Sequence, residues 1–234
     1  MDTLEFKTAS LASIQVGAPA SYGSEEASDP HDQPWTTGFY KKPLEGKVFV
    51  ATTNIQGDGQ ADLKHHGGPD KAVLAYGADH YPQWRESLAL PQMPHGAFGE
   101  NLTIAGLSEE CVCIGDVFRI GSAIFQLSQP RQPCWKLARR WRMHELVALV
   151  VRNGRTGWYF RVLQEGWIDS GLPVELVERC NPDWTVARAN RIMHFHRTDA
   201  SLTLELAEVP KLAVSWVDEL RERAERLRVP VASD

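Results

Sequence analysis

Cys134 lies in the segment QPRQPCWKLARRW, directly after a proline and at the expected first turn of a helix. A helix N-terminus and the basic side chains of Arg131 and Lys136 favour a nearby negative charge. We therefore expect the pKa of the Cys134 thiol to lie below its usual value of about 8.5, which increases the thiolate fraction at neutral pH. A thiolate binds metals and attacks electrophiles, so Cys134 is the strongest candidate functional residue. The alternative for a lone cysteine is an inert core position.

A second candidate is the segment HHGGPD at residues 65–70. Two glycines and a proline predict a tight, irregular turn in which the backbone can approach a ligand closely. Consecutive N–H groups in such a turn can bind an anion, and Lys64 and Lys71 could add positive charge for a phosphate. An ordinary turn between two strands is an equally supported alternative, because a short glycine turn is a weak motif.

The segment FGENL at residues 98–102 places Glu100 and Asn101 between apolar Phe98 and Leu102. Buried polar groups need hydrogen-bond partners, and both side chains can bind or orient a ligand. The simpler alternative is that they bond the backbone of a loop.

The other candidates are weaker. Cys111 and Cys113 form a C-x-C pair with no second Cys or His pair at zinc-site spacing nearby, which favours core packing. Cys180 shows no partner, and His194 and His196 are expected at the surface. Walker, G-x-S-x-G, H-E-x-x-H and G-x-G-x-x-G motifs are absent from the sequence.

Composition places the chain among ordinary globular proteins. Of 234 residues, 43% are hydrophobic and 24% charged, and the net charge is −5, which gives no general attraction to nucleic acid or to an anionic membrane. No apolar run approaches the roughly 20 residues needed to span a bilayer, and the N-terminus does not resemble a secretory signal. Four scattered cysteines are too few for a disulfide framework, so we expect a reducing cytoplasm.

Hydrophobic periodicity and turn residues predict a strand-rich first part followed by helices. Strands are expected at 10–16, 47–54, 72–76, 156–163 and 173–179, a hairpin at 116–128 around a type II′ turn at Gly121-Ser122, and a long exposed loop at 17–34. Helices are expected from Asp79, at 134–152 with a break near Arg142 and a cap at Gly154, and three times between 183 and 229. The last three have expected caps at Asp183 or Thr185, at Asp199 and around Pro210.

Four motifs occur in an order that resembles the MOSC-domain family. They are GDGQADLKHHGGPDKAVLAYGADHYPQW, FGENLTIAGL, GDVFRIGSAIFQLSQPRQPCWKLARRW and RTGWYFRVL. The chain is most similar to the bacterial stand-alone type with a C-terminal three-helix (3-alpha) domain, as in the 6-N-hydroxylaminopurine resistance proteins. The resemblance implies an α+β fold, mainly β, with a closed β-barrel-like domain at residues 1–180 and a three-helix appendage at 181–234.

The same resemblance implies binding of the molybdenum cofactor, molybdopterin. Cys134 matches the family's metal-ligating cysteine and would be the catalytic residue. The expected cofactor-binding residues are Lys64, His66, Gly67, Gly68, Asp70, Lys71, Glu100, Asn101 and Arg131.

Relatives of this type are associated with the reduction of small N-hydroxylated compounds, including hydroxylaminopurine base analogues. The chain has no C-x4-C-x2-C run and no flavin motif, so the electrons are expected from a separate reductase. The alternative is a non-catalytic carrier in which Cys134 holds the cofactor or a persulfide sulfur. A nucleic-acid or partner module in the helical appendage is disfavoured, since glutamates at 219, 222 and 225 offset arginines at 221, 223, 226 and 228. We expect no nucleic-acid partner and no membrane partner. The sequence is compatible with a homodimer.

Overall fold

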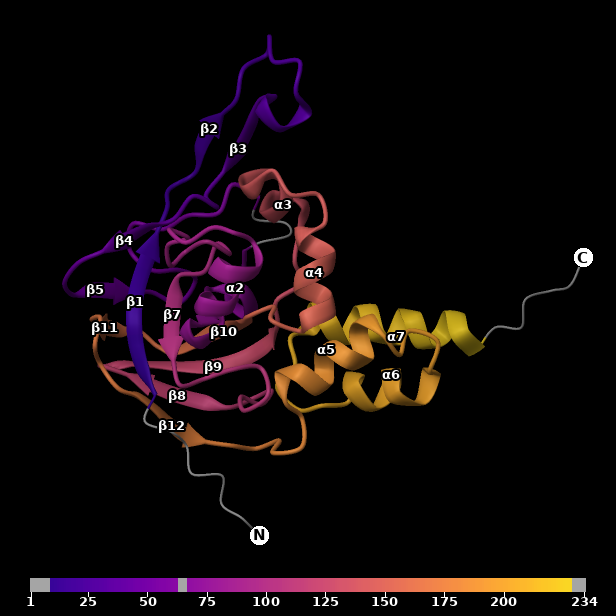
Figure 1. Cartoon of the computed structure of the whole chain (residues 1–234). Coiled ribbons are helices and arrows are strands. Elements are labelled where there is room, and N and C mark those ends of the chain that lie inside the picture. Colours follow the sequence, from indigo (N-terminus) through magenta and orange to yellow (C-terminus); the bar gives the residue numbers. More distant parts are fainter. Residues whose placement is uncertain (1–8, 63–66, 229–234) are drawn as a thin grey trace, which may run out of the picture.

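The largest sheet of the structure has eight strands (Figure 1). The computed structural model describes residues 9–62 and 67–228. The strand order is β12-β8-β9-β10-β6-β7-β1-β4, in which β6 and β7 pair in parallel and the other neighbours are antiparallel. The strands are β1 (Ser10–Val16), β4 (Lys42–Leu44), β6 (Val73–Gly77), β7 (Leu102–Ala105), β8 (Val117–Ile120), β9 (Ala123–Pro130), β10 (Trp158–Gln164) and β12 (Val174–Glu178).

Two small sheets and the helices complete the fold. The small sheets pair β2 (Ala20–Tyr22) with β3 (Trp35–Thr37) and β5 (Val48–Val50) with β11 (Gly166–Ile168). The α-helices are α2 (Tyr81–Ser87), α3 (Trp135–Trp141), α4 (Leu146–Asn153), α5 (Val186–His194), α6 (Ala200–Ala207) and α7 (Val214–Arg228). The short 3-10 helices are η1 (Pro30–Asp32), η2 (Pro69–Lys71) and η3 (Ala78–His80).

Strand β6 separates two apolar clusters. All five of its residues are buried, and successive side chains of a strand point to opposite faces. Val73 and Ala75 therefore contribute to the main core, while Tyr76 packs with the residues of α2, α3 and α4 on the other face. This double coverage explains why the segment reads as a continuous apolar run.

The β8–β9 hairpin agrees with its prediction. Gly121 has φ +57°, while Ser122 is not among the residues with positive φ, as a type II′ turn requires. The chain then follows β9 without interruption to Pro130, four residues before Cys134.

The expectation of a closed barrel is wrong, although the mixed α+β class is confirmed. The end strands of the order, β12 and β4, do not pair within the described residues. Closure is partial: Leu11 N donates to Leu172 O (2.9 Å) and Val174 N donates to Ala9 O (2.9 Å). The physical reason is that two segments pair with the same edge of β1. The second half of β1 pairs with β4, so only its first half is left to pair with the segment that precedes β12.

The prediction of a plain loop at residues 17–34 is also wrong. This segment contains β2 and η1, and β2 forms a projecting hairpin with β3 (Figure 1). The Tyr22 ring contacts those of Trp35 and Tyr40, with centroids 6.3 and 4.5 Å away. Aromatic packing orders a stretch whose Gly, Ser and Asp content is typical of loops.

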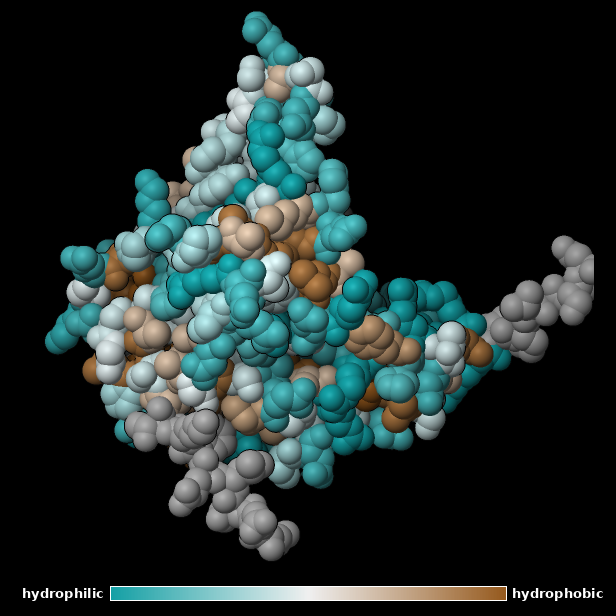
Figure 2. Space-filling view, in the orientation of Figure 1, coloured by the Kyte–Doolittle hydropathy of each residue, from teal (hydrophilic) through white to brown (hydrophobic). Residues whose placement is uncertain are grey.

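The three predicted C-terminal helices are present and share the main core. The Thr185 side chain caps α5 by accepting from Arg188 N (3.1 Å), and the Asp199 side chain caps α6 by accepting from Leu202 N (2.9 Å). The third helix begins at Val214, a few residues after the cap expected around Pro210. One cluster of buried apolar side chains extends from the sheet into α5, α6 and α7. On the face shown in Figure 2 these helices present mostly hydrophilic side chains.

Within the described ranges, no helix combines the length and the apolar character needed to cross a lipid bilayer.

Candidate functional site

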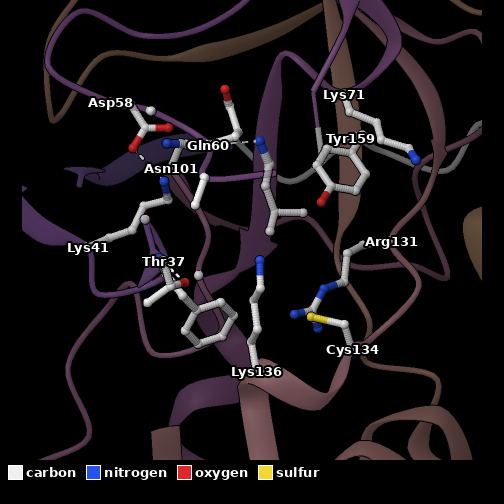
Figure 3. A pocket seen from close by; sticks show the side chains of 16 residues that line it. Thr37, Lys41, Asp58, Gln60, Lys71, Asn101, Arg131, Cys134, Lys136 and Tyr159 are labelled. Atoms are coloured by element: carbon white, nitrogen blue, oxygen red, sulfur yellow. Dashed lines mark hydrogen bonds and ion pairs between the residues drawn. The ribbon is translucent and has the colours of Figure 1, made fainter. Parts of the chain in front are cut away.

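A pocket lies where the loops after β3 and β5 meet the start of α3 (Figure 3). It contains about 580 Å³ of space between its atoms, including the part open to solvent. Its lining residues are Thr37, Gly38, Phe39, Lys41, Asp58, Gly59, Gln60, Ala61, Lys71, Leu74, Gly99, Asn101, Arg131, Cys134, Lys136 and Tyr159.

Cys134 reaches this pocket because β9 delivers the chain to it. Arg131 N donates to Gly157 O (3.0 Å), which holds the exit of β9 against the beginning of β10. Cys134 is then the N-cap of α3, with extended backbone angles and a carbonyl that accepts from Leu137 N (3.1 Å). The predicted helix start at this position is confirmed, and the cysteine is free and half-buried.

Arg131 is the buried cation beside the thiol. Only 3% of its surface is exposed, and its Nη2 donates to Phe98 O (3.2 Å). Its Nη1 is buried and has no hydrogen-bond partner in the structure. A buried donor without a partner is costly, so this atom indicates a site for an acceptor from outside the chain.

An ion pair between Lys41 and Asp58 lies across the pocket from Cys134 (Figure 3). Asp58 Oδ1 accepts from Lys41 and from Gly17 N (2.8 Å), while its buried Oδ2 has no partner in the structure. Burial lowers the pKa of Lys41, and the neighbouring Asp58 carboxylate opposes this effect. This side of the pocket therefore offers an unused acceptor, whereas the Arg131 side offers an unused donor.

Tyr159 and Lys136 complete the polar lining. Burial raises the pKa of Tyr159 to about 12, although the Arg131 charge opposes the rise, so the phenol is neutral at physiological pH. The Lys136 ammonium points into the pocket (Figure 3). Burial lowers the pKa of Lys71, against the influence of Asp70 and Glu219. Cationic side chains outnumber carboxylates in this lining, which suits an anionic ligand.

The structure brings four of the predicted site residues into this pocket: Lys71, Asn101, Arg131 and Cys134. The amide of Asn101 is engaged by backbone, because its Nδ2 donates to Gln15 O (3.3 Å) and its Oδ1 accepts from Leu74 N (3.1 Å). Its neighbours thus fix this side chain in the wall. Lys64 and His66 lie outside the described residues.

Glu100, another predicted cofactor-binding residue, is not among the residues that line the pocket. Its buried carboxylate accepts from Gly96 N (2.6 Å), Phe98 N (3.1 Å), Thr103 Oγ1 (3.0 Å) and the Tyr81 hydroxyl. These bonds supply the partners that a buried carboxylate needs, three donors on Oε1 and one on Oε2. The simpler alternative, that this residue holds its own loop, describes what it does.

Gly67, Gly68 and Asp70 are also absent from the pocket lining. Asp70 Oδ1 pairs with Arg161 Nε (2.8 Å), and its Oδ2 accepts from Val214 N (3.3 Å). Its carboxylate therefore joins the turn to β10 and to the start of α7. Gly68 precedes η2 with φ +91°, a conformation that favours glycine.

Asp58, Lys41, Tyr159 and Lys136 were not among the predicted binding residues. Asp58 could have been recognised from the sequence, because it lies between Gly57 and Gly59 inside one of the four family motifs. For Lys136 the available signal was the position two residues after Cys134. Lys41 and Tyr159 carry no local signal.

The remaining cysteines lie elsewhere. Burial and the neighbouring Asp116 raise the pKa of Cys113 to about 11, which agrees with core packing. Among the described residues, no group of three or more His, Cys, Asp and Glu side chains could hold a metal ion. A metal at Cys134 would therefore need most of its ligands from a non-protein group.

Family models match two parts of the chain. Residues 62–175 match the MOSC domain, and residues 184–226 match the YiiM-like 3-alpha helix domain. The uncharacterized protein YflK of Bacillus subtilis (strain 168) is 47% identical over 191 residues, which cover 82% of this chain and 86% of YflK.

Two further relatives bear on structure and activity. The crystal structure of YiiM from Geobacillus stearothermophilus superimposes with a TM-score of 0.77 at 36% identity and covers 92% of this chain and 99% of that one. A protein of Gibberella moniliformis (strain M3125 / FGSC 7600) named Reductase is 37% identical over 191 residues, which are 80% of this chain but 34% of that protein.

Proposed function

The chain belongs to the MOSC-domain family, in the group with a C-terminal YiiM-like 3-alpha helix domain, and on this premise we propose that it is a molybdenum-cofactor-binding reductase of N-hydroxylated compounds. One arrangement carries the proposal: the Cys134 thiol and the unpartnered Nη1 of Arg131 line the same pocket. The fungal relative named Reductase supports the reaction class.

The pocket residues fit the chemistry of this cofactor. A soft thiolate is a suitable molybdenum ligand, and the absence of a multi-residue metal cluster in the described residues suits a metal that an organic group brings along. The cofactor has an anionic phosphate, and its pterin carries N–H donors. The two unused buried atoms match these groups, since Arg131 Nη1 is a donor and Asp58 Oδ2 an acceptor.

We assign roles to the chain's own residues on this basis. Cys134 would ligate the metal, Arg131 with Lys136 and Lys71 would hold the anionic groups, and Asp58 would accept from the pterin. Lys41 fixes Asp58 in place through its ion pair. The neutral Tyr159 hydroxyl can donate a hydrogen bond into the same space.

The bound cofactor would supply two-electron chemistry at its metal. The net reaction breaks the N–O bond of a hydroxylamine, so that R–NHOH with two electrons and two protons gives R–NH₂ and water. The proposed substrates are small N-hydroxylated compounds such as hydroxylaminopurines, and the proposed electron donor is a separate reductase.

Replacing the thiol tests this function. Loss of a group that merely orients a metal ligand costs about 10–100-fold in affinity, so Cys134→Ala should lose most of its molybdenum and all reduction of 6-hydroxylaminopurine. Elemental analysis of protein from a cofactor-producing host measures the metal, and product formation with a reduced electron donor measures the activity. Cys180→Ala, an exposed cysteine outside the pocket, is the matched control and should retain both.

Two outcomes would contradict the proposal. Full molybdenum content in Cys134→Ala would remove the ligand role. Wild-type protein that contains molybdenum but reduces no N-hydroxylated compound with any donor would instead indicate the alternative, a cofactor or sulfur carrier.

A further inference from the structure

Trp135, the chain neighbour of Cys134, is one of the exposed large apolar side chains, at 55%. It is the first residue of α3, and its ring lies against Trp35 of β3 with centroids 5.4 Å apart. The Arg139 guanidinium carbon lies 4.6 Å from the Trp35 ring centre and 5.7 Å from that of Trp135. Trp135 is therefore in contact with Trp35 and Arg139, while more than half of the residue's surface remains exposed.

The support behind Trp135 is itself anchored. Arg139 Nε donates to His31 O (3.0 Å), and its Nη2 donates to Gln33 O, so the arginine joins α3 to the β2–β3 hairpin. Trp35 also packs against Tyr40, with centroids 5.8 Å apart. Trp135 thus belongs to an aromatic cluster that needs no ligand to form it.

The rings of this cluster are not among the pocket-lining residues, but their chain neighbours are. Cys134 and Lys136, the two chain neighbours of Trp135, both line it, and adjacent Cα atoms are only about 3.8 Å apart. On the other element, Thr37, Gly38 and Phe39 line the pocket, starting two residues after Trp35. Figure 1 shows the base of the β2–β3 hairpin beside α3, where these segments meet.

An exposed aromatic ring that is fixed from behind is a surface on which planar rings stack. Each base that stacks on a protein aromatic side chain gains a substantial affinity that does not depend on base identity, because every base has a π-face. Prior ordering by Trp35 and Arg139 reduces the entropy that binding must offset.

We propose that Trp135, supported by Trp35 and Arg139, binds the planar ring of aromatic N-hydroxylated substrates while their N–O group enters the pocket at Cys134. The inference rests on the proposed reductase function and adds a residue that selects among its substrates. Aromatic hydroxylamines use this surface, whereas small aliphatic hydroxylamines reach the pocket without it.

Binding and turnover are measured on molybdenum-containing protein carrying Trp135→Ala, Trp135→Phe or Trp167→Ala. Trp167 is the matched control, since it is 52% exposed and packs on Phe49 at 5.4 Å, but it lies on β11 and neither it nor its chain neighbours line the pocket. Calorimetry with adenine and no electron donor measures ring binding without turnover. Steady-state kinetics compare 6-hydroxylaminopurine with N-methylhydroxylamine.

Trp135→Ala should weaken adenine binding and raise the KM for 6-hydroxylaminopurine by about tenfold or more, with the KM for N-methylhydroxylamine within about twofold of wild type. Trp135→Phe should recover most of the binding, because it restores an aromatic face. Trp167→Ala should resemble wild type, and molybdenum content and unfolding midpoint should be the same in all variants.

Unchanged adenine affinity in Trp135→Ala, or no adenine binding by the wild type, would overturn the inference. An equal rise in KM for both substrates would also overturn it, since it would indicate general damage to the pocket. If no substrate is reduced at all, the proposed function fails, while the calorimetric comparison still decides whether Trp135 binds a planar ring.

Discussion

At the scale of single residues, two arginines have contrasting surroundings: 21% of the Arg179 side chain is exposed, whereas only 3% of the Arg131 surface is. Arg179 donates to both carboxylate oxygens of the fully buried Asp116, at 2.9 and 2.6 Å, and to Cys111 O at 2.8 Å. Arg131 has a single side-chain bond, to Phe98 O, and an unpaired Nη1 at the pocket. The first arrangement stabilises the fold, whereas the second leaves a buried donor without a partner.

This contrast predicts different effects of the same substitution. In cofactor-free protein, Arg131→Met should change the free energy of unfolding by no more than about 1 kcal/mol, because an incompletely paired buried charge contributes little net stability. Arg179→Met should cost about 3 kcal/mol or more, since it leaves Asp116 buried without its partner. Urea unfolding of protein from a cofactor-deficient host measures both values. Similar large losses in the two variants would assign Arg131 a structural role.

At the scale of elements, the ends of the short helices show where backbone geometry and residue type disagree. Helix α2 ends in a Schellman motif: Leu90 N donates to Arg85 O (2.9 Å) and Ala89 N donates to Glu86 O (3.1 Å). The motif places Ala89 at φ +52°, the left-handed conformation that normally selects glycine. The exposed methyl group of Ala89 therefore destabilises the native state.

Ala89→Gly should raise the free energy of unfolding by roughly 0.5–1 kcal/mol, because glycine adopts the left-handed conformation without steric cost. The matched control is Ala148→Gly in the middle of α4, also exposed, which should lower stability by about 1 kcal/mol. Thermal and urea unfolding of both variants measure the difference. The same sign of change at both positions would contradict this account of the α2 terminus.

At the scale of the whole molecule, the three C-terminal helices are joined to the strand that leads to the site. Ala213 N donates to Ser128 O (2.9 Å), and Ser215 Oγ donates to Gln129 Oε1 (3.3 Å). Both acceptors belong to β9, which ends four residues before Cys134. Buried Trp216 and Leu220 of α7 belong to the same apolar cluster as the strands of the sheet.

A shared core predicts a single cooperative unfolding transition for the full chain. A chain truncated after residue 180 should lose the native near-ultraviolet circular dichroism and bind hydrophobic dyes, since removal of α5–α7 exposes the apolar side chains they cover. Circular dichroism and calorimetry provide the measurement. Two separate unfolding transitions would contradict this prediction, and so would a truncated chain that keeps a native spectrum. Either result would support two independently folding domains, residues 1–180 and 181–234, as the family resemblance implies.

The amino-acid sequence by itself determined the features that depend on near neighbours. The turn at Gly121, the caps at Thr185 and Asp199, and the helix start at Cys134 all follow from interactions within a few residues, where side-chain type and backbone conformation are directly coupled. The four family motifs are likewise stretches of contiguous residues, so their order could be recognised from the sequence without a structure.

Only the tertiary structure decided which polar groups are available. Glu100 and Asp58 are both acids in glycine-containing loops, yet four donors occupy Glu100, while one oxygen of Asp58 stays unused. The partial closure of the sheet and the pairing of Trp35 with Trp135 likewise join segments far apart in the chain. Such contacts depend on the packing of the whole core, and no local pattern of residues encodes them.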